Sequence, residues 1–212
     1  MSSAARRSAL QTLTDRLVNL RLDHPARVGI DGVTASGKTW LANELAGLLE
    51  AAGCPVLRVS LDDFHHPESE RYRRGHDSPE GYYHDAFDYP RFVESVLRPL
   101  GPGGDGHVLV GDLQQAVSLD AILIVDGVFL FRPELDAYWD YRIFVQVEPA
   151  IALQRAIYRD SPRMGGELET RRRYAARYVP GERLYLDAVH PETKADALFE
   201  NSDPQSPRLT LR

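Results

Sequence analysis

The feature that most constrains this fold is a glycine-rich segment between an apolar run and a helical pattern. Residues 28–42 read VGIDGVTASGKTWLA, in which Gly32, Gly37, Lys38 and Thr39 satisfy the pattern G-x-x-x-x-G-K-[ST]. Small residues let backbone N–H groups approach a phosphate closely, and glycine adopts the dihedral angles that such a turn requires. The segment therefore predicts a phosphate-binding loop that joins a strand to a helix.

The loop also predicts how a nucleotide and its metal ion would be held. The helix that follows would present unpaired backbone N–H groups to a phosphate. Lys38 would contact the β- and γ-phosphates of ATP, and the Thr39 hydroxyl would bind Mg²⁺. Asp126 ends the apolar run of AILIVDGVFL and would hold the water shell of the same ion. Nucleotide contacts are predicted for Gly32, Thr34, Ala35, Ser36, Gly37, Lys38, Thr39 and Trp40.

Apolar runs along the chain predict a parallel sheet that helices cover on both faces. These runs lack polar alternation, which is typical of strands buried on both sides. They lie at 27–31, 55–61, 121–126, 141–147 and, more weakly, 197–201. Helical patterns lie at 39–52, 89–97, 149–159 and 168–178, and leucines at helical spacing predict a helix within 1–24. This alternation indicates a doubly wound, three-layer α/β/α fold with a mostly parallel sheet.

Composition narrows the class of protein. The chain has 212 residues, which suits one domain over 1–212, and its net charge of -6 argues against a general nucleic-acid binder. No apolar run approaches the ~20 residues of a membrane span. A single cysteine, Cys54, allows no internal disulfide and fits a reducing compartment, so a cytoplasmic location is expected. The sequence leaves a homo-oligomer open.

A polar, aromatic segment over 62–90 interrupts the pattern and predicts a substrate-binding insertion. Asp62 and Asp63 follow a predicted buried strand, so at least one carboxylate should lie at the edge of the sheet where ligands bind. A carboxylate there could accept the proton of an attacking hydroxyl group. Residues 82–85, YYHD, add aromatic surface and hydrogen-bond acceptors that suit a sugar ring.

Three arginines predict a lid over the phosphates. Arg155 and Arg159 are four residues apart and so share one helix face, and Arg163 lies just beyond them. Arginines on a closing segment neutralise the charge of the transferring phosphoryl group and help to exclude water. The alternative interpretation is a solvated basic face. We expect the lid region to cover 155–178.

The chain resembles, over nearly its whole length, the uridine kinase and phosphoribulokinase family of P-loop small-molecule kinases. GIDGVTASGKT is similar to the phosphate loop of that family, and LDDFH to the segment that carries its catalytic aspartate. YYHDAFD resembles the sugar-contacting segment, VDGVFLF the acidic strand end, LQRAIYRD the lid helix and KADALFEN the closing strand. The resemblance implies a P-loop NTPase fold with a helical lid.

The resemblance also implies roles for individual residues. Asp62 takes the place of the catalytic base, and His65 stands at the end of the same segment on the substrate side. Tyr83 and Asp85 become the candidate ribose contacts, with His84 as an alternative to Asp85. Lys38, Arg155 and Arg159 would be catalytic through the phosphates, and Arg163 would contact the substrate.

The implied function is an ATP- and Mg²⁺-dependent kinase that phosphorylates a primary hydroxyl group of a small molecule. A uridine- or cytidine-like nucleoside is the leading acceptor. In uridine kinases a hairpin with aromatic and histidine residues recognises the base, whereas the corresponding 106–120 here has no aromatic residue and one histidine. Another riboside, a pentose or a pantothenate-like acceptor therefore stays open. A nucleotide-binding regulatory module without transfer activity is the alternative from another class.

Overall fold

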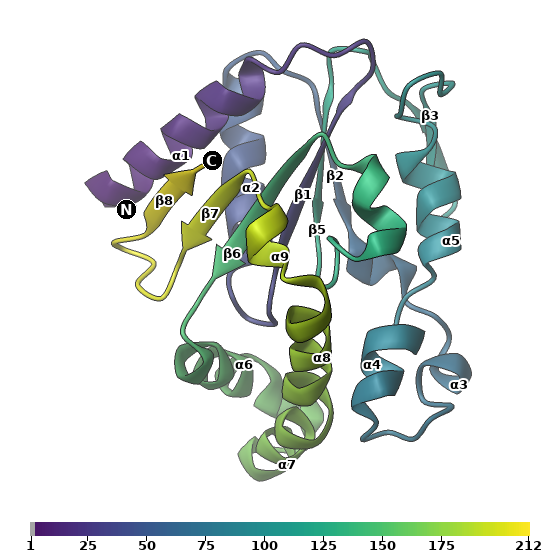
Figure 1. Ribbon diagram of the computed structural model, residues 1–212, viewed down its shortest axis with the longest axis vertical. Helices are drawn as coiled ribbons and strands as arrows, with labels where there is room; N and C mark the ends of the chain where they lie inside the picture. The colour runs from purple at the N-terminus through teal and green to yellow at the C-terminus, as the bar shows by residue number, and fades with distance from the viewer. Residues whose placement is uncertain (1–2) are drawn as a thin grey trace.

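A central sheet of parallel strands organises the computed structural model, which describes residues 3–212 (Figure 1). Residues 1–2 of the predicted N-terminal segment lie outside the described residues. The strands run in the order β2-β5-β1-β6-β7-β8, and β8 alone is antiparallel to its neighbour. Their bounds are β1 Ala26–Gly32, β2 Val56–Ser60, β5 Ile122–Asp126, β6 Tyr141–Gln146, β7 Ala197–Glu200 and β8 Arg208–Leu211.

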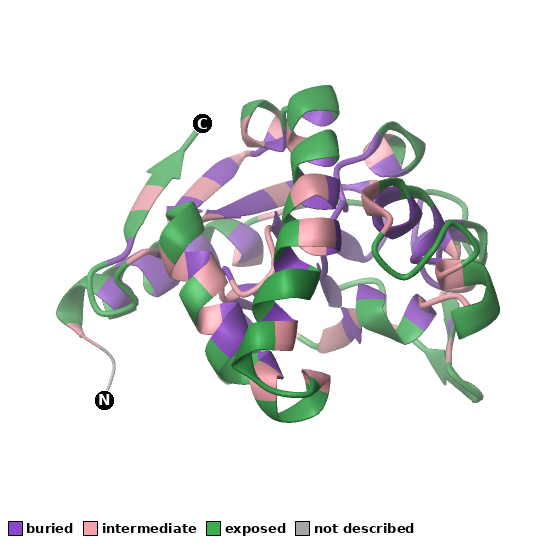
Figure 2. Ribbon diagram, turned by 90° about the horizontal axis from the view of Figure 1, so that it is seen from below, coloured by how far each residue is buried: buried purple, intermediate pink, exposed green. Residues whose placement is uncertain are grey.

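Helices cover both faces of this sheet, so the predicted three-layer α/β/α architecture is confirmed. On one face α1 (Ala4–Val18) and α2 (Lys38–Ala51) share a core with Ile122 and Ile124. The next residues along β5, Leu123 and Val125, face the opposite core, because side chains alternate across a strand. In Figure 2 the strands are mostly buried, whereas the outer faces of the helices are exposed.

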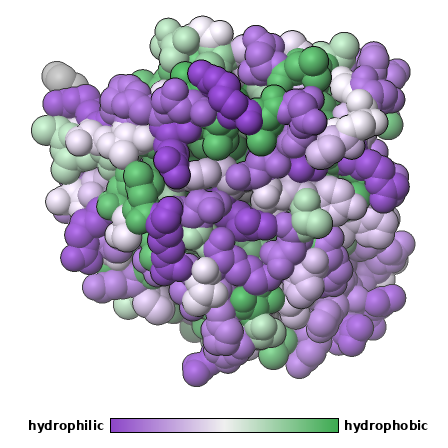
Figure 3. Space-filling model, turned by 45° about the horizontal axis from the view of Figure 1, so that its top comes forward, coloured by the Kyte–Doolittle hydropathy of each residue, from purple (hydrophilic) through white to green (hydrophobic). Residues whose placement is uncertain are grey.

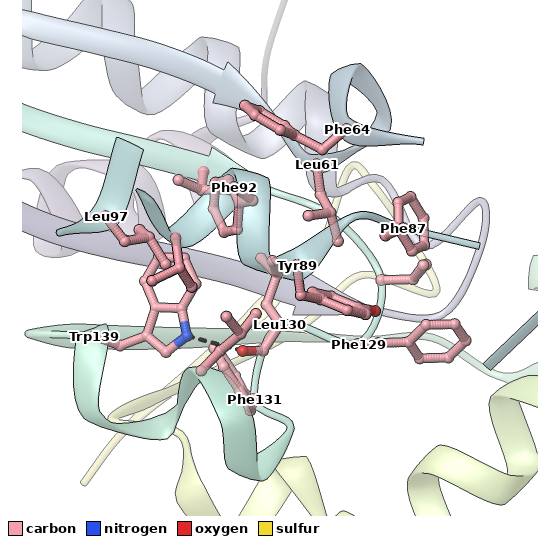
Figure 4. Close-up of a cluster of buried hydrophobic side chains, with 14 of the residues drawn as sticks. Leu61, Phe64, Phe87, Tyr89, Phe92, Leu97, Phe129, Leu130, Phe131 and Trp139 are labelled. Carbon is pink, nitrogen blue, oxygen red and sulfur yellow. Dashed lines mark hydrogen bonds between the residues drawn. The ribbon is translucent and has the colours of Figure 1, made fainter. Parts of the chain in front are cut away.

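The second core is rich in aromatic side chains (Figure 4). It lies beneath α5 (Tyr89–Phe92), which continues as the π-helical segment η2 (Val93–Leu97), and the 3₁₀ helix η3 (Pro133–Tyr138). The rings of Phe64 and Phe92 lie 5.1 Å apart, and Trp139 Nε1 donates a hydrogen bond of 2.8 Å to the Leu130 carbonyl. This core fixes the end of β2, after which the predicted insertion begins.

Helical segments gather at the carboxyl ends of the strands (Figure 1). Those that follow β6 are α6 (Pro149–Met164), α7 (Glu167–Arg173), the π-helical η4 (Tyr174–Tyr178) and α8 (Val179–Val189). The short α9 (Pro191–Lys194) then leads from α8 to the start of β7. The insertion after β2 contains the 3₁₀ helix η1 (Leu61–Phe64), α3 (Glu68–Arg71) and α4 (Pro79–Asp85). Helix α4 packs against η4 and α8, so the insertion and the lid region lie side by side.

The predicted strands and helices are found close to their predicted bounds, but several elements were not predicted. The helix expected over 149–159 extends to Met164, and the one expected over 168–178 consists of α7 and η4. Helix α8, strand β8 and the hairpin of β3 (His107–Val110) and β4 (Leu113–Ala116) are additions. Within residues 3–212, no helix is both long enough and apolar enough to cross a membrane.

Candidate active site

The glycine-rich loop occupies the turn from β1 to α2, as predicted. Gly37 directly precedes α2 with φ 99°, a left-handed conformation that glycine adopts without strain. A Cβ on Gly32 would lie 2.5 Å from the Val145 carbonyl oxygen, so no larger residue fits there. The buried Lys38 lies along the loop, and its Nζ donates to the Val33 carbonyl at 2.8 Å. The loop therefore has the close approach and the cation that phosphate binding needs.

The two residues predicted to bind the metal ion lie in contact with each other. Thr39 Oγ1 donates to Asp126 Oδ2 at 2.6 Å, and Arg58 Nη2 donates to the other oxygen of Asp126 at 2.7 Å. A hydroxyl and a carboxylate oxygen are the donors that Mg²⁺ prefers, usually completed by water and substrate phosphates. Among the described residues no group of three or more His, Cys, Asp or Glu side chains could hold a metal ion. The two oxygens thus fit an ion that a bound nucleotide helps to ligate.

Buried carboxylates surround the lysine. Burial lowers the pKa of Lys38, while Glu182, Asp31, Asp62 and Asp126 oppose that shift. Burial raises the pKa of Asp31 to about 6, although its carboxylate accepts hydrogen bonds from the Tyr185 hydroxyl and two backbone amides. The site therefore places several carboxyl groups close to the buried ammonium group of Lys38.

Glu182 and Asp31 were not identified as site residues from the sequence. Glu182 lies on α8 and accepts a hydrogen bond of 2.6 Å from the Thr34 amide within the phosphate loop, and burial raises its pKa. The sequence does contain a hint of the role of Asp31, since this carboxylate stands within an apolar run next to the loop. It contains no such hint for Glu182, because 148 residues separate it from Thr34 in the chain.

A pocket of about 820 Å³ opens beside the loop, between α2, α6 and the segment after β7. The predicted residues that line it are Ala35, Gly37, Lys38, Thr39, Trp40, Arg155 and Arg159. Residues that were not predicted also line it, namely Arg6, Asn43, Glu44, Asn201, Pro204 and Gln205. Its position next to the phosphate loop suits the base and ribose of a nucleotide.

The three arginines of the predicted lid differ in their contacts and in their distance from the pocket. Arg155 Nη2 donates to the carbonyl oxygens of Asn201 and Ser202 at 3.0 and 2.7 Å, which ties α6 to the pocket wall. Arg159 reaches the pocket and forms two hydrogen bonds with Asp160. Arg163 also pairs with Asp160, but it is not part of the pocket lining. The structure thus brings Arg155 and Arg159 to the phosphate side, and Arg163 lies further out.

On the acceptor side, Asp62 follows β2 directly, within η1. Its carboxylate is exposed and close enough to Lys38 to influence the pKa of that lysine. The Asp62 carbonyl is hydrogen-bonded to His65 Nδ1 at 2.8 Å, and the His65 ring stacks on Phe87 with centroids 4.5 Å apart. Burial lowers the pKa of His65. The neutral histidine thus packs beside the proposed base.

The two candidate ribose contacts are both buried. Tyr83 packs edge-on against Phe129, and the Arg132 guanidinium lies 5.0 Å from the centre of its ring. Both oxygens of Asp85 are engaged, one by Arg73 at 2.5 Å and the other by Arg74 at 2.6 Å. Because Asp85 is only 4% exposed, a ribose diol would have to compete with these arginines for its carboxylate. The neighbouring His84 is exposed.

The β3–β4 hairpin lies at the opposite end of the sheet from the phosphate loop (Figure 1). It follows η2 and precedes β5, whose far end carries Asp126. On the face of the molecule seen in Figure 3, most of the surface is hydrophilic, with small separate apolar patches. The outward side chains of the hairpin include Leu109 and Leu113, which are exposed. In this conformation the hairpin therefore lies away from the phosphate loop.

Comparisons with known proteins agree with this architecture. No family model matches the chain. It is 32% identical over 155 residues to uridine-cytidine kinase B of Dictyostelium discoideum, a match that covers 69% of this chain and 63% of the relative. It is 31% identical over 121 residues to human nicotinamide riboside kinase 1, covering 57% of this chain and 58% of the relative. The chain thus spans less than two thirds of the length of either relative.

A solved structure shows the same fold. The structure of a possible uridine kinase from Bacillus stearothermophilus superposes with a TM-score of 0.70 at 21% identity, covering 91% of this chain and 97% of the other. The sheet order and the phosphate loop between β1 and α2 define the P-loop nucleotide-binding fold. Within that class of fold, the comparisons support a uridine kinase-like family for the chain.

Proposed function

We propose that this uridine kinase-like phosphotransferase moves the γ-phosphoryl group of ATP to the primary hydroxyl group of a riboside, with nucleosides of the uridine and cytidine type as the leading acceptors. The observation that carries the proposal is the register of three neighbouring parallel strands. Ile30 of β1 and Ser60 of β2 both pair with Asp126 of β5. The phosphate loop, Asp62 and Asp126 therefore leave the sheet side by side at its ligand-binding edge.

Each residue has a separate task in this proposal. The loop amides and Lys38 bind the phosphates. Thr39 and Asp126 would hold Mg²⁺, which would supply positive charge to the phosphate oxygens. The acceptor oxygen forms a bond to the γ-phosphorus as the bond to the β-phosphate oxygen breaks, and ADP leaves. The acceptor proton passes to Asp62. Arg155 and Arg159 stabilise the negative charge that spreads during transfer.

The identity of the riboside is a separate part of the proposal. Two observations favour an acceptor whose base is not read by the hairpin: the hairpin lies away from the site, and one relative is named a nicotinamide riboside kinase. Nicotinamide riboside is therefore the second candidate. A pentose or a pantothenate-like acceptor ranks below it. A cytoplasmic location belongs to the same proposal and is supported by the lone cysteine, Cys54.

The test measures ADP release from ATP and Mg²⁺ with uridine, cytidine, nicotinamide riboside, ribose and pantothenate in turn. We expect turnover that depends on a riboside, and its loss in the Lys38→Ala variant. Turnover only with pantothenate or free ribose would exclude the riboside assignment. Tight ADP binding by calorimetry, with no acceptor giving turnover, would favour a nucleotide-binding regulatory module instead.

A further inference from the structure

Helix α1, which precedes the sheet, sends one buried arginine into the nucleotide pocket. The side chain of Arg6 lines that pocket and is only 6% exposed. One edge of its guanidinium pairs with Glu44 of α2, with Nε and Nη2 donating at 3.0 and 2.5 Å. The other edge points toward the segment after β7. Nη1 donates to Asn201 Oδ1 at 3.1 Å and to the Pro204 carbonyl at 3.2 Å.

Asn201 connects this arginine to the phosphate loop. Its side-chain oxygen accepts from Arg6, and its Nδ2 donates to the Ser36 carbonyl in the loop at 2.7 Å. Its backbone carbonyl accepts from the lid residue Arg155 at 3.0 Å. The amide group also packs directly on Gly37, where an added Cβ would lie 2.4 Å from Nδ2. Asn201 is thus a buried junction between α1, the phosphate loop and α6.

We propose that Arg6 is a positioning residue for the nucleotide, acting through Asn201 on the phosphate loop. The bond from Arg6 orients the Asn201 amide, so that its nitrogen faces the Ser36 carbonyl. The hydrogen bond to the Pro204 carbonyl holds the segment after β7, which forms another part of the pocket wall. A loop already held in its binding conformation loses less conformational entropy when a nucleotide binds. The proposal shares only nucleotide binding with the proposed function and does not depend on which acceptor is used.

The planar fork of arginine suits this position. Its donors are arranged so that one edge can satisfy a carboxylate while the other edge reaches two different oxygens. A lysine has a single ammonium group, which could keep the ion pair with Glu44 but not the whole set of contacts. The Arg6→Lys variant therefore separates the structural ion pair between α1 and α2 from the contacts to Asn201 and Pro204.

The test is calorimetric titration of the full chain with ADP and Mg²⁺, together with steady-state kinetics when an acceptor is known. For Arg6→Lys we expect the dissociation constant of ADP to rise about tenfold, equivalent to about 1.4 kcal/mol, with little change in kcat. The melting temperature should fall by a few degrees, because the buried oxygens of Asn201 and Pro204 lose a donor. Asn201→Asp keeps the acceptor for Arg6 but removes the donor to Ser36, so it should weaken ADP binding similarly. Combining the two variants should add little.

Arg16→Lys is the matched control, because Arg16 is exposed on the same helix and is not part of the pocket lining. It should bind ADP like the wild type. ADP affinity unchanged in both Arg6→Lys and Asn201→Asp would overturn the proposal, as would a fall in melting temperature with normal ADP affinity in the folded protein. Fully additive effects would show that Arg6 does not act through Asn201. A wild-type chain that binds no ADP would instead refute the proposed function and this inference together.

Discussion

Asp62 and Asp63 are adjacent exposed carboxylates with different surroundings. Asp62 is among the carboxylates that act on the buried Lys38, whereas Asp63 is not. We expect Asp62→Asn to lower kcat by at least ~10²-fold, because general-base catalysis contributes about 10²–10⁴ in rate. Asparagine keeps the shape of the side chain but is a far poorer proton acceptor. ADP affinity, measured by calorimetry, should stay nearly unchanged.

Asp63→Asn serves as the control for this prediction and should retain most of the activity. If Asp63→Asn abolishes turnover while Asp62→Asn is mild, the base has been assigned to the wrong carboxylate. If neither change matters, the proton leaves the acceptor by another route.

Asp31 makes stability depend on pH. Burial raises its pKa from 3.8 to about 6, so the folded protein binds this proton more tightly than the unfolded chain does. Its contribution to the free energy of unfolding is therefore fully present below about pH 4 and is lost as the pH rises through about 6. Since one pKa unit corresponds to about 1.4 kcal/mol, the loss is on the order of 3 kcal/mol.

Urea unfolding of the wild type and of Asp31→Asn between pH 4 and 7 measures this dependence. The asparagine presents a donor to groups that are themselves donors, so the variant should be less stable overall. The informative quantity is the difference in unfolding free energy, wild type minus variant, which should decrease from pH 4 to 6 and then level off. A difference that does not vary with pH would show that Asp31 does not titrate in this range.

At the scale of elements, Arg177 links the lid region to the acceptor insertion. From the π-helical η4 its guanidinium donates to the carbonyl oxygens of Arg71, Gly75 and Ser78 at 3.0–3.3 Å. These hydrogen bonds hold the backbone of the turn between α3 and α4. The side chain is buried and also stacks on Tyr72. Movement of the lid should therefore be transmitted directly to the acceptor insertion.

We expect Arg177→Met to loosen residues 71–78 while leaving the nucleotide pocket intact. Loss of hydrogen bonds to a buried charged group costs about 1.5–3 kcal/mol, so the KM of the acceptor should rise about tenfold or more. Hydrogen exchange at the amides of 71–78 should become faster, and ADP affinity should not change. Arg183→Met, at an exposed position on α8, is the control. Normal exchange in 71–78 would contradict the link.

Helix ends were harder to predict than helix positions. The sequence pattern predicts a helix over 149–159, whereas the helix of the structure also contains Pro162, which has no backbone donor. In the structure α6 continues to Met164 and ends at Gly165, whose φ is 86°. The carbonyl that loses its partner belongs to Tyr158, an exposed residue, where water can replace the missing bond. Solvent exposure of Tyr158 thus allows the helix to continue past a proline. The sequence pattern alone does not show which helix face is exposed.

At the scale of the whole molecule, the sheet and the phosphate loop could be predicted because their signals are local. Buried strands are continuous apolar runs, and the loop is a contiguous motif. The pocket wall could not be predicted, since Arg6 and Asn201 are 195 positions apart. Neither residue type is distinctive alone. Their relation depends on β7 pairing beside β6 and on α1 packing beside α2, which only the folded chain brings together.

The two hydrophobic cores lie on opposite faces of the same strands, so neither should persist without the other. We therefore expect one calorimetric unfolding transition, with equal calorimetric and van't Hoff enthalpies, as for a single domain. ADP with Mg²⁺ should move the whole transition to higher temperature, because it binds the folded state alone. Two separated transitions would contradict the single-domain prediction for residues 1–212.

The surroundings of the two tryptophans have a consequence for optical measurements. Trp139 is 5% exposed, and its indole N–H is held by the Leu130 carbonyl, whereas Trp40 is 76% exposed where it lines the nucleotide pocket. Their fluorescence should differ accordingly, with a constant blue-shifted signal from Trp139 and a red-shifted signal from Trp40 that collisional quenchers such as iodide reach. Nucleotide binding should shield only the second signal. The unmodified chain therefore carries its own spectroscopic probe of nucleotide occupancy.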